Sequence, residues 1–159
     1  MTSQWVISAS ERGVTELRLK KRGSARTENN SARAEKRRAA AEKELSAYFA
    51  GRAKSFAARY DISALRPFTQ AVLKLTAQIP YGEVRSYEWV ARKLGKPKAA
   101  RAVGNALARN PVPIIIPCHR VVRTDGTIGG FALGSAWKKR LLNMEKRFVK
   151  SEASSKKRA

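Results

Sequence analysis

The chain contains a single cysteine, Cys118, and a single histidine, His119, and the two are neighbours. One cysteine cannot form a disulfide within the chain, and a structural zinc ion usually takes three or four cysteine or histidine ligands. We therefore expect neither a disulfide framework nor a metal site. The fold must depend on an apolar core, and 43% hydrophobic residues in a chain of 159 are enough to build one.

The charge of the chain is strongly unbalanced. Thirty-four Lys and Arg residues against twelve Asp and Glu give a formal net charge of +22. Such an excess favours polyanionic partners, nucleic acid first and an anionic membrane surface second. A generally basic, solvated surface would explain any single basic run equally well. Residues 89–124, however, contain no acidic residue, and the motifs described below lie mainly there.

Residues 1–65 are predicted to form a small α/β domain. Short apolar or alternating runs around a turn predict a β-hairpin, and an Ala-, Glu- and Lys-rich stretch before Gly51 predicts a helix. In chain order we expect strands at Trp5–Ala9 and Val14–Leu19, a basic loop at 20–31, a helix at Ala32–Ala50, and an irregular stretch or short strand at Phe56–Leu65.

Residues 66–150 are predicted to form a mostly helical second domain, so the fold class is α+β. Two short helices joined by a glycine-containing turn make a helix-turn-helix pattern, and residues 151–159 are expected to be a basic tail that need not be ordered. The predicted elements are a helix from Pro67 with an apolar stripe (Phe68, Val72, Leu75, Ile79), a helix from the N-cap Ser86 to Leu94, a helix at Lys98–Arg109, a buried extended run at Ile114–Ile116, a loop from Pro117 to Gly130, and a final helix containing Trp137, Leu141, Met144 and Phe148.

No segment is suited to a membrane. The longest apolar run, Val112–Ile116, is too short to cross a bilayer. Residues 1–10 lack the basic start and long apolar stretch of a secretory signal. The sequence therefore predicts a soluble cytoplasmic protein, associated with the nucleoid in a prokaryote, without a membrane partner.

The Cys118-His119 pair suggests thiol chemistry. A cysteine nucleophile reacts as the thiolate, and a pKa of about 8.5 leaves only a few per cent ionised at pH 7. His119 can accept the proton, and Arg120 and Arg123 add positive potential. Neighbouring side chains of an extended segment point to opposite faces, so contact would need a turn or a bridging water. Glu145, on the apolar face of the final helix, is the candidate to orient the imidazole, although an ordinary surface position stays open.

The helix predicted at Lys98–Arg109 is narrow. Small residues dominate it, and its charged residues are all basic. A narrow helix can bring its backbone close to a groove of DNA, although it could equally pack closely against neighbouring elements. The small residues are Ala99, Ala100, Ala102, Gly104, Ala106 and Ala108.

Three linked motifs resemble one family. The segment from Asn110 to Val122, reading NPVPIIIPCHRVV, resembles the active-site signature of O6-alkylguanine-DNA alkyltransferases. The preceding Lys98–Asn105, KAARAVGN, is similar to the DNA-recognition helix of that family, and Tyr81–Tyr87, YGEVRSY, resembles the segment before its helix-turn-helix. The resemblance runs without a gap from Phe68 to Glu145, about half of the chain. Residues 1–65 match only in size and in their strand-then-helix pattern.

The resemblance implies direct-reversal DNA repair by a methylated-DNA–protein-cysteine methyltransferase. Such a protein flips an O6-alkylated guanine out of the duplex and moves the alkyl group irreversibly to its cysteine, once and without a cofactor. The implied catalytic residues are Cys118 as acceptor, His119 as the base acting through a water, Glu145 holding His119, Asn110 supporting the array, and Tyr87 donating toward the leaving guanine.

The family also implies how DNA would be held. Its recognition helix enters the minor groove, with the protein as a monomer on double-stranded DNA, and Arg101 resembles the residue that replaces the flipped base. The implied DNA contacts are Ser86, Lys98, Ala99, Arg101, Ala102 and Arg109. The implied pocket residues are Pro113, Val121, Phe131, Ala132 and Leu133. The last three depart from the usual tyrosine-serine-glycine of the family, which is expected to affect bulky alkyl groups more than the core reaction.

Three other functions are compatible with parts of the sequence. A lesion sensor or a general DNA-binding protein would need no reactive thiol, and alkyltransferase-like sensors typically carry tryptophan at the position of Cys118. A packaging or ribosome-associated protein would explain the charge alone. A cysteine hydrolase would need an oxyanion site, for which no further motif is present.

Overall fold

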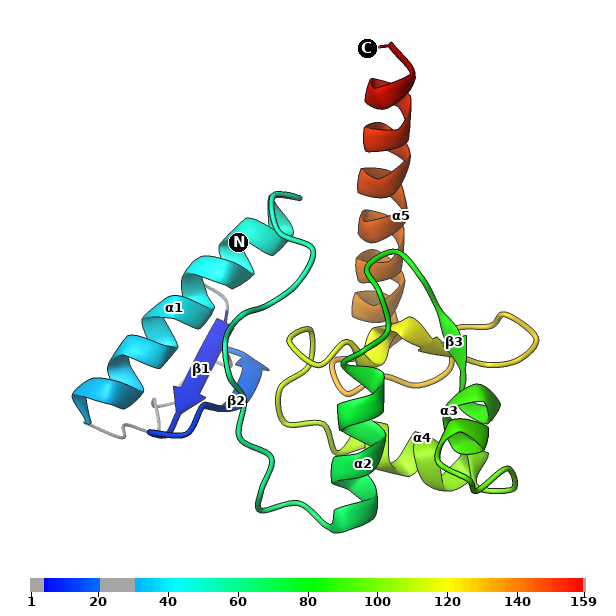
Figure 1. Cartoon of the computed structure of the whole chain (residues 1–159), viewed down its shortest axis with the longest axis horizontal. Helices are drawn as coiled ribbons and strands as arrows, with labels where there is room; N and C mark the ends of the chain where they lie inside the picture. Colours follow the sequence, from blue (N-terminus) through cyan, green and yellow to red (C-terminus); the bar gives the residue numbers. More distant parts are fainter. Residues whose placement is uncertain (1–4, 21–30, 159) are drawn as a thin grey trace.

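A computed structural model of the chain describes residues 5–20 and 31–158, with the backbone alone for 155–158; the loop predicted at 21–30 lies outside the described residues. Strands β1 (Trp5–Ala9) and β2 (Val14–Leu19) pair antiparallel, and helix α1 (Ala32–Phe49) packs against them (Figure 1). This confirms the predicted hairpin and helix. We call β1, β2 and α1 the N-terminal lobe.

Local sequence explains the limits of α1. The Ser31 hydroxyl accepts a hydrogen bond from the backbone N–H of Ala34 at 3.4 Å, as an N-cap does. The helix ends before Gly51, whose φ of +73° is readily adopted only by glycine. Leu45 and Tyr48 point from the buried face of α1 into the protein.

The second half of the chain is mostly helical, so the α+β class is confirmed. We call it the C-terminal lobe. A short parallel pair of strands, β3 with β4, was not predicted. The elements are α2 (Pro67–Thr76), β3 (Arg85–Ser86), α3 (Tyr87–Lys93), α4 (Ala100–Ala108), the 3₁₀ helix η2 (Cys118–Arg120), β4 (Val121–Val122) and α5 (Ser135–Arg158).

Both helices of the predicted helix-turn-helix are present as α3 and α4. The Ser86 hydroxyl caps α3 by accepting from the N–H of Trp89 at 3.0 Å. The turn between the helices contains Gly95 at a φ of +70°, and the two helices pack against each other.

Helix α2 is shorter than predicted and is rotated relative to the expected stripe. It ends at Thr76, whose hydroxyl donates to the Val72 carbonyl at 2.8 Å inside the core. Ile79 is buried but lies in the turn that follows, and Phe68 and Leu75 are only partly buried. The buried face consists of Thr69, Val72, Leu73 and Thr76.

The buried run Ile114–Ile116 is not extended, which corrects the prediction. Ile114 has a φ of +75°, a backbone conformation that is rare for a β-branched residue. The Ile116 N–H donates to the Val112 carbonyl at 3.0 Å, so the segment closes into a turn. Such strain persists only where surrounding contacts enforce it, and here the side chains are buried.

The two lobes share one apolar core. The Trp5 ring contacts Phe49 in a stacked arrangement and Trp137 of α5 edge-on, with ring centroids 5.8 and 5.2 Å apart. The Leu17 N–H donates to the Pro111 carbonyl at 2.8 Å, so β2 is tied to the chain that precedes Cys118. The division into domains after residue 65 stays a prediction.

Helix α5 includes most of the C-terminal segment. It continues to Arg158, so residues 151–158 are helical (Figure 1), and the assignment of residues 151–159 as a separate basic tail stays a prediction. Within the described parts of the chain, no helix combines the length and apolarity needed to span a membrane.

Candidate active site

Cys118 begins η2, directly before the short strand β4. Its side chain is almost fully buried, yet it lines one edge of a cavity of about 910 Å³. Tyr87 of α3 and Arg101 and Gly104 of α4 line the same cavity. The thiol is therefore covered by protein on most sides and accessible from one.

Asn110 connects the thiol to the turn before it. Its Nδ2 donates to Cys118 Sγ at 3.1 Å and to the Ile116 carbonyl at 3.0 Å, while its Oδ1 accepts from the Val112 N–H at 3.0 Å. Asn110 is itself buried. These contacts stabilise the strained turn at Ile114 and set the direction of the sulfur.

The thiol of Cys118 is protonated at neutral pH. Burial raises its pKa to about 11, although the hydrogen bond from Asn110 and the charge of Lys138 act in the opposite direction. A thiolate forms only when another group accepts the proton. A base near the sulfur is therefore required for nucleophilic chemistry here.

His119 and Glu145 are in direct contact. The distance from His119 Nε2 to Glu145 Oε1 is 2.8 Å, and both side chains are buried. Burial lowers the pKa of His119, while the carboxylate acts to raise it. No hydrogen bond joins the thiol to the imidazole in the described chain.

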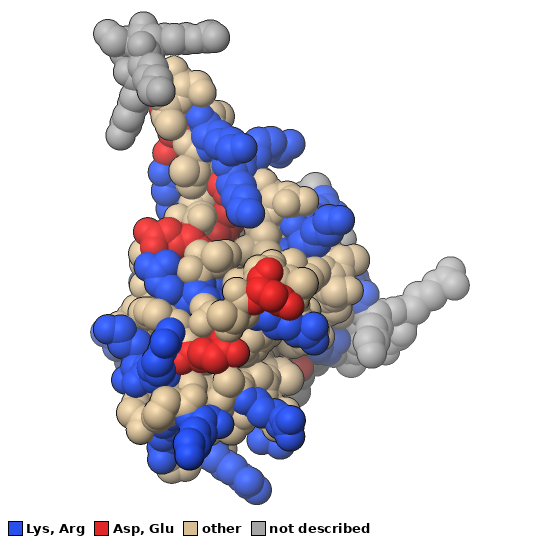
Figure 2. Space-filling view, turned by 90° about the vertical axis from the view of Figure 1, so that its right-hand side faces the viewer, with Lys and Arg blue, Asp and Glu red and all other residues tan. Residues whose placement is uncertain are grey.

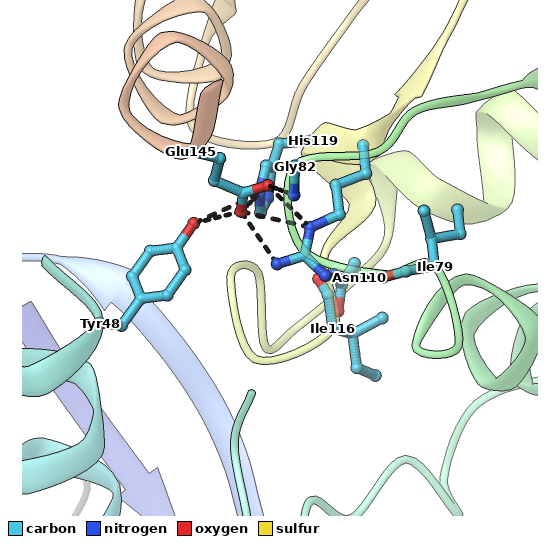
Figure 3. A network of polar contacts seen from close by, with 8 residues as sticks. Tyr48, Ile79, Gly82, Asn110, Ile116, His119 and Glu145 are labelled. Atoms are coloured by element: carbon cyan, nitrogen blue, oxygen red, sulfur yellow. Dashed lines mark hydrogen bonds and ion pairs between the residues drawn. The ribbon is translucent and has the colours of Figure 1, made fainter. Parts of the chain in front are cut away.

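The Glu145 carboxylate is the centre of a larger network (Figure 3). Arg120 donates to both of its oxygens, at 3.1 Å from Nε to Oε2 and 2.9 Å from Nη2 to Oε1. The Tyr48 hydroxyl donates to Oε1 at 2.6 Å, and the Gly82 N–H donates to Oε2 at 2.9 Å. Burial alone would raise the pKa of Glu145, but hydrogen bonds from His119 and Arg120 hold it at about 2.

The ionised carboxylate determines the tautomer of His119. An anion accepts hydrogen bonds and has none to give, so Nε2 of His119 carries the proton that faces Glu145. The lone pair of the neutral ring then belongs to Nδ1. This nitrogen is buried and has no hydrogen-bond partner in the described chain, so it is available to accept a proton.

Tyr87, which lines the same cavity as the thiol, is in contact with Lys138 of α5. Lys138 Nζ donates to the carbonyls of Val121 and Gly130, at 2.6 and 3.0 Å, and to the Tyr87 hydroxyl at 3.4 Å. Burial lowers the pKa of Lys138 to about 8. Because the Tyr87 oxygen accepts from the ammonium group, its own proton is free to be donated into the cavity.

The structure separates the predicted pocket residues into two groups. Phe131 and Ala132 line the cavity. Pro113, Val121 and Leu133 do not line this cavity, and their place in a substrate pocket stays a prediction. The Val121 side chain is fully buried, and Lys138 donates to its carbonyl. Arg123, expected to add positive potential near the thiol, lines the cavity, and so do Glu88 and Asp125, which were not predicted.

The predicted DNA-contact residues lie on α4, next to its two ends, and at the N-terminal end of α3. Arg101 is exposed and lines the cavity, while Lys98, Ala102 and Arg109 are exposed but do not line it. Ser86 and Ala99 are partly buried, each as the N-cap of a helix. Lys and Arg side chains spread over the face drawn in Figure 2, with smaller acidic areas between them.

Besides Glu88 and Asp125 of the cavity lining, the sequence did not reveal the polar contacts of Lys138, Arg120 and Tyr48. Lys138 precedes Glu145 by seven positions, two turns of α5, so it lies on the same apolar face of the helix. A charged side chain on that face could have marked Lys138 as a candidate site residue. Arg120 was interpreted only as a source of positive potential. Tyr48 pairs with a residue 97 positions away, and nothing local indicates such a contact.

Gly129 is expected to be a critical glycine of this site. Its φ is +65°, and an added Cβ would lie 2.8 Å from the Tyr87 hydroxyl. Gly129→Ala should lower the free energy of unfolding by about 1–2 kcal/mol for the backbone conformation and by roughly 1–3 kcal/mol more for the overlap. Gly126→Ala is the matched control, since its φ is +83° with open space around it. Urea denaturation measures the free energy of unfolding of both variants. Equal decreases in the two would contradict the expected overlap with Tyr87 at position 129.

Comparison with known proteins identifies relatives of this chain. Residues 67–147 match the model of the 6-O-methylguanine DNA methyltransferase, DNA binding domain. A methylated-DNA–protein-cysteine methyltransferase of Methanosarcina mazei is 35% identical over 91% of this chain and 92% of its own length. Proteins of the same name from Methanosarcina barkeri and Methanosarcina acetivorans are each 46% identical over 99 residues. Those alignments span 62% and 63% of the two relatives, less than two thirds of their length.

Solved structures agree with this assignment. The crystal structure of Mycobacterium tuberculosis OGT in complex with DNA superposes with a TM-score of 0.78 at 35% identity, covering 91% of this chain and 87% of that one. The O6-methylguanine-DNA methyltransferase of Pyrococcus kodakaraensis gives a TM-score of 0.62 at 29% identity, covering 87% and 89%. The chain belongs to the 6-O-methylguanine DNA methyltransferase family.

Proposed function

We propose that this protein repairs DNA by transferring the alkyl group of an O6-alkylguanine to Cys118 Sγ, as a single-turnover methyltransferase. The observation that carries the proposal is the His119–Glu145 contact at 2.8 Å, which leaves the buried Nδ1 of the ring free to accept a proton. The thiol that would lose this proton borders a cavity large enough for a nucleobase.

The reaction is a displacement at a saturated carbon. The thiol proton passes through a water molecule to His119 Nδ1, and the sulfur attacks the alkyl carbon as the bond from that carbon to O6 breaks. Glu145 and its hydrogen bonds stabilise the imidazolium that forms. The electron pair of the broken bond stays on the guanine, where a hydrogen bond from the Tyr87 hydroxyl offsets the developing charge.

A base inside a duplex is inaccessible to the buried thiol, so the target nucleotide has to be flipped into the cavity. The exposed Arg101 borders this cavity from α4, which supports a role in occupying the position of the flipped base. The surrounding basic side chains would bind phosphates.

Three finer features belong to this proposal. The protein acts as a monomer on double-stranded DNA, and α4 enters the minor groove, which its small exposed residues favour. It acts in the cytoplasm, where the DNA of a prokaryote lies. The proposed DNA contacts remain those of the sequence analysis: Ser86, Lys98, Ala99, Arg101, Ala102 and Arg109.

Intact-mass spectrometry tests the function directly. The protein is incubated with a duplex that contains one O6-methylguanine and with the same duplex containing guanine. We expect a gain of about 14 Da, one methyl group in place of a hydrogen, only with the modified duplex and located at Cys118. An unchanged mass with lesion-selective binding would instead indicate a sensor, and an unchanged mass without selectivity a general DNA-binding protein.

Arg101→Ala should affect duplex substrates selectively. We expect transfer from the duplex to slow at least about tenfold, because an unstacked base costs a few kcal/mol to hold outside the helix. Reaction with free O6-methylguanine base should be unchanged. Arg33→Ala, which removes the same charge from an exposed position of α1, is the control, and both rates follow from time-resolved mass spectra. Equal losses with duplex and free base would rule out this role for Arg101.

A further inference from the structure

The N-terminal lobe contributes a buried hydroxyl to the site. Tyr48, near the end of α1, is fully buried, and its hydroxyl donates to Glu145 Oε1 at 2.6 Å (Figure 3). The same hydroxyl lies 3.4 Å from His119 Nε2. Three aromatic rings hold Tyr48 in place, those of Phe49, Phe56 and Tyr81, with centroids 5.4 to 5.9 Å away.

Tyr48 and His119 share one acceptor atom. Glu145 Oε1 accepts from the Tyr48 hydroxyl, from His119 Nε2 and from Arg120, at 2.6, 2.8 and 2.9 Å. Each donor to an anion withdraws negative charge from it, so the bonds to the other donors weaken. The shortest of these three bonds comes from Tyr48. Tyr48 does not line the cavity, so an effect of its hydroxyl on the imidazole would pass through Glu145.

We propose that Tyr48 is a positioning residue that, through the shared Glu145 oxygen, limits the basicity of His119 and so keeps its Nδ1 unprotonated at neutral pH. This inference rests on the proposed alkyl transfer for its functional consequence. The physical claim about His119 holds without that reaction.

Every charged or titratable group around the imidazole bears on its protonation. Glu145 of α5 raises the pKa of His119, whereas Arg120 of η2 and Lys138 of α5 lower it, and burial lowers it most. The Tyr48 phenol stays protonated, since burial and then the Glu145 charge raise its pKa. Tyr81 faces Glu145 and Arg120 from the segment after α2; burial raises its pKa to about 12, so it too is neutral.

The experiment uses the single histidine of the chain. Because His119 has no counterpart elsewhere in the sequence, one set of imidazole NMR signals reports its protonation in the full-length protein. We expect Tyr48→Phe to make the imidazole more basic, with the acid-dissociation constant of the imidazolium lowered roughly three- to tenfold. The reason is that the carboxylate loses a strong donor and binds the imidazolium more tightly. In the transfer assay, the loss of rate on acidification should then begin at a higher pH.

Tyr81→Phe is the matched control. It removes a hydroxyl that is buried in the same aromatic cluster but has no hydrogen-bond partner in the described chain, and it should leave the titration of His119 unchanged. Incorporation of 3-fluorotyrosine at position 48 keeps the ring and strengthens the donor, so it should raise the dissociation constant. The protein with 3-fluorotyrosine therefore tests the effect of Tyr48 on His119 even if Tyr48→Phe does not fold.

The possible outcomes distinguish the role inferred for Tyr48 from the proposed alkyl transfer. If 3-fluorotyrosine and phenylalanine at position 48 both leave the His119 titration unchanged, the inference is wrong. A rate loss in Tyr48→Phe that is the same at every pH would also overturn it, since that pattern indicates damaged packing alone. If the wild-type protein transfers no alkyl group, the proposed function fails, but the NMR titration still tests Tyr48.

Discussion

Replacing Cys118 with alanine is expected to abolish alkyl transfer while leaving DNA binding in place. Cys118 is the sole thiol of the chain, so no other side chain can supply a thiolate. The side chains expected to bind DNA lie on α4, next to its ends and at the N-cap of α3, and none of them contacts the sulfur. The intact mass after incubation with an O6-methylguanine duplex should therefore stay unchanged, with an affinity within about threefold of wild type, or less than 1 kcal/mol.

Cys118→Ser is the matched control for this variant. A hydroxyl in place of the thiol can still accept the hydrogen bond that Asn110 Nδ2 makes to the sulfur at 3.1 Å. It is a much poorer nucleophile toward saturated carbon, so transfer should again be lost, while the local structure is better preserved. Any remaining methyl transfer to either variant would show that the acceptor is misassigned.

Replacing Glu145 with alanine is expected to have the largest effect on stability. The change leaves the Arg120 guanidinium buried without its carboxylate, together with the donors at Tyr48, Gly82 and His119. Breaking a buried ion pair by removing one partner typically costs about 3–5 kcal/mol. Urea denaturation at pH 7 measures the loss, and transfer should fall with it because His119 is no longer held.

The pH dependence of this loss has a definite sign. The pKa of Glu145 is about 2 in the folded protein against 4.5 in an unfolded chain. A depressed pKa contributes stability that is complete above pH 4.5 and disappears as the pH falls toward 2. The difference between wild type and Glu145→Ala should shrink over that range, and a constant difference would contradict the assignment.

Glu152→Ala provides the control on the same helix. Glu152 pairs with Lys54 at the surface, where both side chains are about half exposed. An exposed pair of this kind contributes about 0–1 kcal/mol. If Glu152→Ala lowered the free energy of unfolding as much as Glu145→Ala, the loss of stability would come from α5 as a whole rather than from the buried carboxylate.

Local patterns in the sequence predicted the local structure well. The hairpin, α1 and the N-cap Ser86 follow from signals within a few residues, and the structure has them. The run Ile114–Ile116 has the composition of a buried strand, but the hydrogen bonds of Asn110 fold it into a turn. Composition alone could not distinguish these conformations, because the decisive contacts come from one side chain outside the run.

The site was predictable where its residues are adjacent in sequence or lie on one helix face. Cys118 and His119 adjoin, and Glu145 was notable as a carboxylate on an apolar face. Tyr48 could not be found this way, since its partner lies 97 positions away. Lys138 could have been found by the argument used for Glu145, because both charges occupy the same face of α5.

The Glu145 carboxylate has a consequence for the dynamics of the protein. It joins four segments that are far apart in the chain, through Tyr48, Gly82, Arg120 and α5 itself. Opening any one of these segments would expose a charged group to partial hydration and weaken the bonds to the other three. The segments should therefore open together as one cooperative unit. The backbone amide of Gly82 should then exchange its hydrogen with solvent about as slowly as the most protected amides of the core, although it lies in a surface turn.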